Sequence, residues 1–202
     1  MRTLFATVAV LVLAVISLAW ATDGFRAVTA EGARRLAIAE HPAAVPDVAL
    51  VDMQGRALTL ADYRGRVLLV EFIYSTCPTL CLTLGESFAD ALEAVRARGA
   101  GTQAALLSIS FDLERDTPEA LRDYAERHGA DGRIWRIARP TTRRDLRALL
   151  STFGVTVIPD PPLGFQHNAA IHVVDESGKL VRILDVAADQ AIEAMVSEMG
   201  RL

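Results

Sequence analysis

Two cysteines stand close together in the sequence, and the chain has no others. Cys77 and Cys81 enclose the residues Pro-Thr-Leu and follow the apolar run VLLVEFIY at residues 67–74. In a helix, residues four apart lie on one face with Cβ atoms roughly 5–6 Å apart, so both sulfurs can point to one spot. Such a pair can form a structural disulfide, act as a redox couple or supply two metal ligands.

The local sequence favours reactive thiolates over a structural crosslink. Pro78 suits the first position of a helix, and a helix start carries unpaired N–H groups and a partial positive charge that stabilise a thiolate. A disulfide across so short a loop restricts the unfolded chain very little. A closed zinc site normally takes four ligands, which two cysteines cannot supply. A redox couple and an exchangeable metal site remain as alternatives.

A histidine far along the chain, His167, adjoins an apolar strand, where a lone histidine is usually packed or solvated. His167 ends the proline-rich stretch VTVIPDPPLGFQH, which we expect to be irregular, and precedes an apolar strand. Two thiolates and one neutral imidazole form a soft, three-coordinate set that suits Cu(I). His172 alternates with Ile171 and Val173, so we expect it on the opposite face of that strand and away from the metal.

The rest of the chain alternates strand and helix patterns, and these elements must position the three residues. Apolar runs predict buried strands at residues 67–74 and 102–111, and helical spacing predicts helices at 83–98, 118–128, 141–153 and 187–199. Residues 47–65 and 169–186 read as hairpins that turn at 54–55 and 176–179. This order predicts an α/β fold with a mixed sheet, helices on its faces and an added N-terminal hairpin. The cysteines then fall at the carboxyl end of a central strand, where ligands bind in open α/β sheets.

The first residues form a separate segment. Residues 4–21 carry no charge and reach roughly 27 Å as a helix, enough to cross a bilayer core. Arg2 precedes them, which predicts a cytoplasmic amino end and an exported remainder. A retained anchor is favoured by this length, and a signal peptide cleaved after Ala19-Trp20-Ala21 is the alternative. We therefore expect an anchor at residues 1–22, a spacer at 23–45 and one domain at 46–202.

Composition is consistent with one exported globular domain. The chain has 202 residues, of which 51% are hydrophobic, and a net charge of −4. Its basic residues are scattered in pairs without interleaved aromatics, which argues against nucleic acid as a partner. Export places the cysteines where disulfides form and persist.

Four features together resemble the Sco/SenC family, which comprises membrane-anchored, thioredoxin-like proteins that deliver copper to cytochrome c oxidase. They are the Cys77-Pro-x-x-Cys81 segment after an apolar strand, the segment DLERDTP with Asp112 and Asp116, the position of His167 eight residues before Asp175, and the length and order of elements. The resemblance covers about residues 46–202 together with the N-terminal anchor.

The resemblance implies that Cys77, Cys81 and His167 bind copper as Cu(I), Cu(II) or both. It also implies delivery to the copper-bearing subunit of cytochrome c oxidase or to another cuproprotein, at the bacterial cytoplasmic membrane with the domain on the periplasmic side. Asp112 and Asp116 suit a turn or cap, and we also expect one of them near the site because strand ends converge there. Two alternatives stay open: a thiol–disulfide oxidoreductase with redox-active Cys77 and Cys81, and a redox or copper sensor.

Overall fold

The computed structural model describes residues 1–25, 27–77, 80–161 and 164–200, and of residues 80–82 it describes the backbone only. The chain divides into two compact units, Met1–His41 and Pro42–Leu202. All buried hydrophobic residues found among the described ones lie between Val48 and Met195. The second unit therefore contains a complete core of its own.

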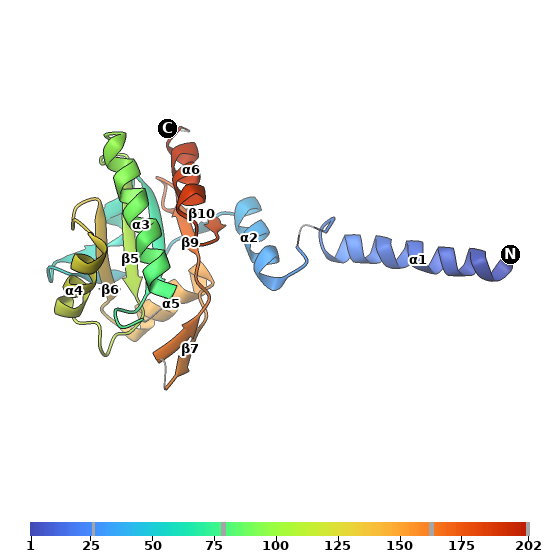
Figure 1. Ribbon diagram of the computed structural model, residues 1–202, viewed down its shortest axis with the longest axis horizontal. Coiled ribbons are helices and arrows are strands. Elements are labelled where there is room, and N and C mark those ends of the chain that lie inside the picture. The colour runs from blue at the N-terminus through green and yellow to red at the C-terminus, as the bar shows by residue number, and fades with distance from the viewer. Residues whose placement is uncertain (26, 78–79, 162–163, 201–202) are drawn as a thin grey trace. The chain divides into compact units, whose positions relative to one another are not determined.

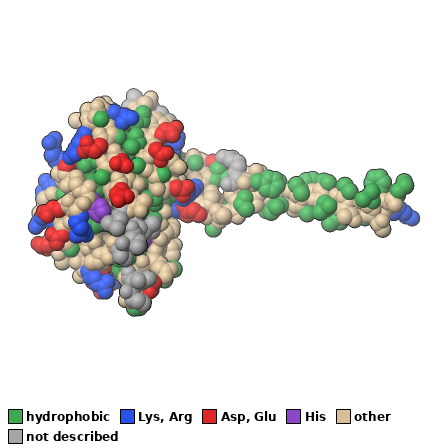
Figure 2. Space-filling view, in the orientation of Figure 1, with side chains coloured by type: hydrophobic (Ala, Val, Ile, Leu, Met, Phe, Trp, Pro, Cys, Tyr) green, Lys and Arg blue, Asp and Glu red, His purple; other side chains and the backbone are tan. Residues whose placement is uncertain are grey.

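The first unit consists of α1 (Arg2–Ala21) and α2 (Ala30–Glu40). Helix α1 is long and apolar enough to cross a membrane, with a mean hydropathy of 2.5 and no buried residue in its apolar window. Hydrophobic side chains follow its whole length in Figure 2, with basic ones only at the amino end. Length and composition fit an anchor and also fit a signal sequence. Helix α2 lies in the expected spacer, and the Thr29 side chain caps it by accepting from the Gly32 amide.

The second unit is built on a mixed sheet (Figure 1). Within the described residues the strand order is β1-β10-β9-β4-β5-β6-β2-β3. Strands β4 and β5 pair in parallel along their whole length, and every residue in both is buried. The bounds of the eight strands are Ala43–Ala44 for β1, Ala49–Asp52 for β2, Ala57–Thr59 for β3, Val67–Ile73 for β4, Ala104–Ser110 for β5, Trp135–Pro140 for β6, Ile171–Val174 for β9 and Lys179–Leu184 for β10.

Helices cover both faces of this sheet. They are α3 (Leu80–Ala97), α4 (Pro118–His128), α5 (Arg143–Phe153) and α6 (Ala188–Met199), with a short 3₁₀ helix, η1 (Leu60–Tyr63), after β3. Because β4, β5 and β6 are neighbours joined through α3 and α4, right-handed connections place both helices on one face. Helix α3 also contacts α6 there, and their apolar residues pack against Val67, Leu69 and Trp135. Phe153 of α5 packs against Phe72 on the opposite face.

Most elements agree with the sequence prediction, and two segments differ. Within residues 157–167, expected to be irregular, β7 (Val157–Asp160) and β8 (Gly164–His167) pair as a separate antiparallel hairpin. This hairpin lies near the end of the sheet where α3 begins (Figure 1). Residues 43–44, expected in the spacer, pair with β10 instead. Both differences arise because short segments gain backbone partners from a neighbouring strand, which periodicity alone cannot show.

Candidate metal and thiol site

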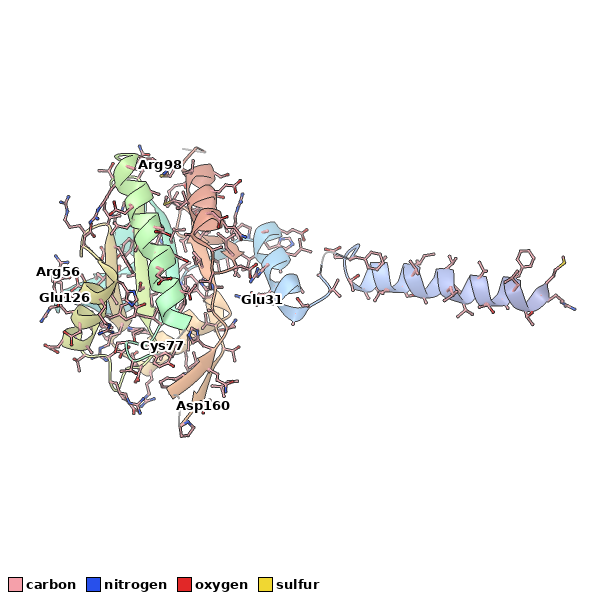
Figure 3. The ribbon with its side chains drawn as sticks, viewed as in Figure 1. Glu31, Arg56, Cys77, Arg98, Glu126 and Asp160 are labelled. Carbon is pink, nitrogen blue, oxygen red and sulfur yellow. The ribbon has the colours of Figure 1, made fainter. Side chains whose placement is uncertain are left out.

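Cys77 lies just beyond the carboxyl end of β4, at the entry to α3. Its backbone N–H donates to the Tyr74 carbonyl at 3.2 Å, which forms a tight turn after the strand. The residue is half-buried, and Figure 3 shows it near the first turn of α3. Position 81 falls in that first turn, but the Cys81 side chain and all of Pro78 and Thr79 lie outside the described residues. The described backbone thus has the strand-to-helix arrangement that the sequence predicts.

A buried carboxylate holds the segment that leads to Cys77. Asp116 accepts hydrogen bonds from the Ser75 amide at 2.9 Å and the Ser75 hydroxyl at 2.6 Å. It also accepts from the Ser110 hydroxyl at 2.5 Å. Burial raises the pKa of Asp116, and the hydrogen bonds from the two serines oppose that effect. Asp116 therefore hydrogen-bonds the residue that lies two positions before Cys77.

The carbonyl of the same serine has a cationic partner. Arg127, in the last turn of α4, donates from Nη2 to the Ser75 oxygen at 2.9 Å. The Arg127 guanidinium also lies over the ring of Tyr124, 5.6 Å from its centroid. The sequence analysis did not identify this residue, and no local pattern could have done so, because the contact joins residues 52 apart.

Asp112 has a more local role. Its Oδ1 accepts from the amides of Glu114 and Arg115, both at 3.2 Å, which closes a turn. Its Oδ2 is buried, faces the Arg115 guanidinium at 3.6 Å and has no hydrogen-bond partner among the described residues. Of the two loop aspartates, Asp116 therefore contacts the cysteine segment and Asp112 shapes its own loop.

His167 ends β8 inside an aromatic enclosure. Its ring packs edge-on against Phe111 at a centroid distance of 5.1 Å and against Tyr74 at 6.3 Å. Both ring nitrogens are buried, and neither has a hydrogen-bond partner in the described part of the chain. Burial lowers the pKa of His167. The Asn168 backbone opposes this shift, although its geometry is not that of a hydrogen bond to the ring. Burial of His167 therefore favours its neutral form, which is the form that binds a metal.

Three contacts position the hairpin that carries His167. Asn168 closes its base, accepting from the Thr156 amide at 2.6 Å and donating to the Gly154 carbonyl at 3.0 Å. The Tyr74 hydroxyl donates to the Phe165 carbonyl at 3.3 Å. Because Tyr74 also accepts from the Cys77 amide, this one residue links the cysteine turn to the hairpin. Cys77 and His167 consequently lie at the same end of the sheet.

The space beside His167 is open. A hollow of about 280 Å³ is lined by Thr156, Ile158, Gln166, His167 and Asn168. Ile158 is 56% exposed at its edge. Among the described side chains no group of three His, Cys, Asp or Glu residues is placed to hold a metal ion. A trio that includes Cys81 lies outside that comparison. An imidazole whose nitrogens have no described partners, at the same end of the sheet as the cysteine turn, fits a soft metal ion that needs one nitrogen and two sulfur ligands.

The remaining two histidines of the second unit have structural roles. His172 is buried, with Nδ1 3.3 Å from the Val70 oxygen and Nε2 3.2 Å from the Phe153 oxygen. It faces away from the core cluster that contains Ile171 and Val173, as the alternation predicted. His128 packs so closely on α3 that a Cβ added at Gly85 would lie 2.3 Å from its Nδ1.

A buried acid on β4 was not singled out by the sequence analysis. Glu71 is fully buried, and its Oε1 accepts from the Ser108 hydroxyl at 2.5 Å. Ser108 in turn accepts from the Trp135 indole N–H at 2.8 Å. The Glu71 Oε2 has no hydrogen-bond partner among the described residues, and burial raises the pKa of Glu71 to about 8. Its signal in the sequence is a single charge inside the run VLLVEFIY.

Residues 37–201 match the family model described as SCO1/SenC. The SCO1 protein homolog of Bacillus subtilis strain 168 is 20% identical over 150 residues, which cover 73% of this chain and 77% of that protein.

Two solved structures illustrate the likeness of the fold. Bradyrhizobium japonicum ScoI with copper bound has a TM-score of 0.66 and 22% identity, covering 77% of this chain and 99% of that one. BsSco, a member of the Sco family of cytochrome c oxidase assembly proteins with an identified disulfide switch, has a TM-score of 0.68 and 19% identity, covering 79% of this chain and 95% of that one. These matches confirm the predicted thioredoxin-like α/β fold.

Proposed function

The chain belongs to the SCO1/SenC family, and on this premise we propose that it binds copper and delivers it to the copper centre of cytochrome c oxidase. Helix α1 tethers it to the cytoplasmic membrane, and the second unit works on the periplasmic side. The observation that carries the proposal is His167, whose two ring nitrogens are buried without hydrogen-bond partners in the described part of the chain. A buried imidazole left unpaired is costly to the fold unless a ligand compensates it.

The copper ligands in this proposal are Cys77, Cys81 and His167. Two thiolates and a neutral imidazole are soft or borderline donors, which suit Cu(I), and imidazole also serves Cu(II). The aromatic rings of Tyr74 and Phe111 keep water from one side of His167 and favour its neutral form. The hollow on the other side leaves a path by which a ligand of the acceptor protein could approach. A carrier needs such an open side because its metal must leave.

The direction of export rests on charge. Helix α1 begins with Arg2, and lysine or arginine at one end of a spanning helix normally stays in the cytoplasm. The second unit follows on the other side, where it would meet the copper-bearing subunit of the oxidase or another cuproprotein.

A second candidate function is thiol–disulfide exchange with partner cysteines. The half-buried Cys77 at a helix entry favours it, and so does the fold shared with BsSco, for which a disulfide switch is described. In that reaction the thiols of Cys77 and Cys81 pass two electrons and two protons to a partner disulfide and become a disulfide themselves. The same thiols must be reduced to bind Cu(I), so the two functions are chemically linked.

Copper titration separates these functions. We expect the reduced domain of residues 42–202, which carries the complete core, to bind one equivalent of Cu(I) in competition with a chromophoric chelator. His167→Ala should weaken binding by about tenfold or more, as loss of a ligand does. Gln166→Ala, on the exposed neighbouring residue, is the matched control. Equal affinities of His167→Ala and wild type would disprove the three-ligand site, and catalytic turnover of a disulfide substrate would then favour the oxidoreductase.

A further inference from the structure

Two consecutive residues at the end of α4 contact residues that precede and follow the Cys77–Cys81 segment. Arg127 hydrogen-bonds the Ser75 carbonyl, two residues before Cys77. His128 packs on Gly85, four residues after Cys81 and one helical turn into α3. Since helix α4 is fixed at its start by the Thr117 cap and Pro118, and packs against β6, it forms a rigid support for both ends of the segment.

The Ser75 peptide itself is held from two sides. The Asp116 carboxyl accepts a hydrogen bond from the Ser75 N–H, and Arg127 donates one to the Ser75 carbonyl. Ser75 and Asp116 are both buried, so the bonds between them are sheltered from water. The bond from the exposed Arg127 is partly buried, and together the two partners fix the direction of the chain toward Cys77. Loss of either partner would free one side of this peptide.

Arg127 brings a charge as well as a hydrogen bond. Among the residues that the structure describes, no carboxylate forms an ion pair with Arg127. The positive charge lies on the carbonyl side of the Ser75 peptide, nearer in the chain to Cys77, and the Asp116 carboxyl lies on its N–H side. A Cu(I) ion with two thiolates carries a net charge of −1, whereas a disulfide is neutral. A nearby cation stabilises the first state relative to the second.

We propose that Arg127 is a positioning residue for the copper site: it orients the Ser75–Cys77 segment and favours the anionic, reduced or copper-loaded state over the disulfide. This inference rests on the proposed function for its copper part. Its redox part depends only on the two cysteines.

The experiment compares Arg127→Gln, Arg127→Lys and Arg122→Gln in the domain of residues 42–202. Arg122 is exposed on the same helix and serves as the matched control. The measurements are Cu(I) affinity, the midpoint potential of the Cys77/Cys81 couple against glutathione, and the thermal unfolding midpoint. We expect Arg127→Gln to weaken Cu(I) binding several-fold. It should also favour the disulfide by up to about tenfold, which lowers the midpoint potential by up to about 30 mV.

Arg127→Lys, which retains the charge, should recover at least half of both effects. A change in the unfolding midpoint alone would show a merely structural contact and overturn the proposal. So would a potential for Arg127→Gln equal to that of Arg122→Gln. If the wild-type domain binds no Cu(I), the proposed function fails, and the potential shift still decides the role of Arg127.

Discussion

Tyr74 and His167 pack edge to face with ring centroids 6.3 Å apart, and Tyr74 also accepts the Cys77 amide. Tyr74 thus connects the two halves of the candidate site, which the sequence places far apart: its backbone carbonyl holds the cysteine turn and its ring packs on His167. The hydroxyl of Tyr74 adds a hydrogen bond to the Phe165 carbonyl in the hairpin. The position of His167 relative to the cysteine turn therefore depends on Tyr74.

Tyr74→Phe removes that hydrogen bond and keeps the ring. We expect the free energy of unfolding to fall by about 1 kcal/mol, with little change in Cu(I) affinity. Tyr74→Leu also removes the edge-to-face contact, so Cu(I) affinity should fall several-fold as His167 loses its support. Chemical denaturation and chelator competition measure the two quantities. Equal copper affinities for Tyr74→Leu and Tyr74→Phe would contradict this role of the ring.

Asp116 and Asp112 give a matched pair for testing what the loop carboxylates do. Asp116→Ala leaves the Ser75 amide and two serine hydroxyls without their acceptor, and we expect it to cost on the order of 3 kcal/mol of unfolding free energy. Asp116→Asn should be tolerated much better. Its carbonyl can replace Oδ2, and its amide can donate to the Ser75 hydroxyl, which is able to accept.

Asp112→Ala is the comparison. It removes turn bonds to two partly exposed amides and an ion pair with the exposed Arg115, so its cost should be about 1 kcal/mol, and copper affinity should not change. Chemical denaturation of the three variants and of wild type measures these unfolding free energies and tests their order. A larger loss for Asp112→Ala than for Asp116→Ala would show that the hydrogen bonds to Ser75 do not stabilise the fold as described.

Glu71 should make stability fall as pH rises. Its pKa is about 8 in the folded protein, against 4.5 as the ordinary value, so between these values the folded state keeps a proton that the unfolded state has released. The stabilisation that Glu71 contributes through its raised pKa is complete below pH 4.5 and is lost as the pH rises toward 8. Each pKa unit corresponds to about 1.4 kcal/mol, which gives a loss on the order of 3 kcal/mol between pH 5 and pH 8.

Glu71→Gln keeps an acceptor for the Ser108 hydroxyl and removes the titration. We therefore expect the variant to be more stable than wild type at pH 8 and close to it at pH 5, by urea denaturation. Trp135 is the one tryptophan of residues 42–202 and hydrogen-bonds Ser108, so its fluorescence should report the same transition in wild type only. Parallel pH profiles of wild type and variant would rule out ionisation of Glu71 as the cause.

How far the sequence predicts this site depends on the range of each interaction. The cysteine turn is predictable because a continuous apolar strand and a helix start adjoin it in the sequence. The β7–β8 hairpin is not, since Pro159 and the neighbouring prolines indicate an irregular segment, and pairing at an edge strand overrides that signal. The contact between Ser75 and Arg127 joins two local patterns that carry no sign of each other. Glu71 is visible as a lone charge, but its unpaired oxygen is evident only in the packed core.

Gly164 links the backbone of the hairpin to the placement of His167. Its φ is +97°, and a Cβ added there would lie 3.0 Å from the Tyr74 ring. Gly178 provides a control, because its φ is +83° but the nearest atom to an added Cβ is 3.6 Å away, on Arg64 in another part of the unit. Alanine at either position adds backbone strain of about 1–2 kcal/mol.

Both variants should therefore unfold more easily, and only Gly164→Ala should also bind Cu(I) less tightly. Its added methyl group pushes against Tyr74, which displaces the ring that packs on His167 and reduces affinity several-fold. Thermal unfolding and Cu(I) competition on the two domains separate strain from positioning. If Gly178→Ala lost as much copper affinity as Gly164→Ala, the loss would follow from general destabilisation, and the hairpin geometry would not control His167.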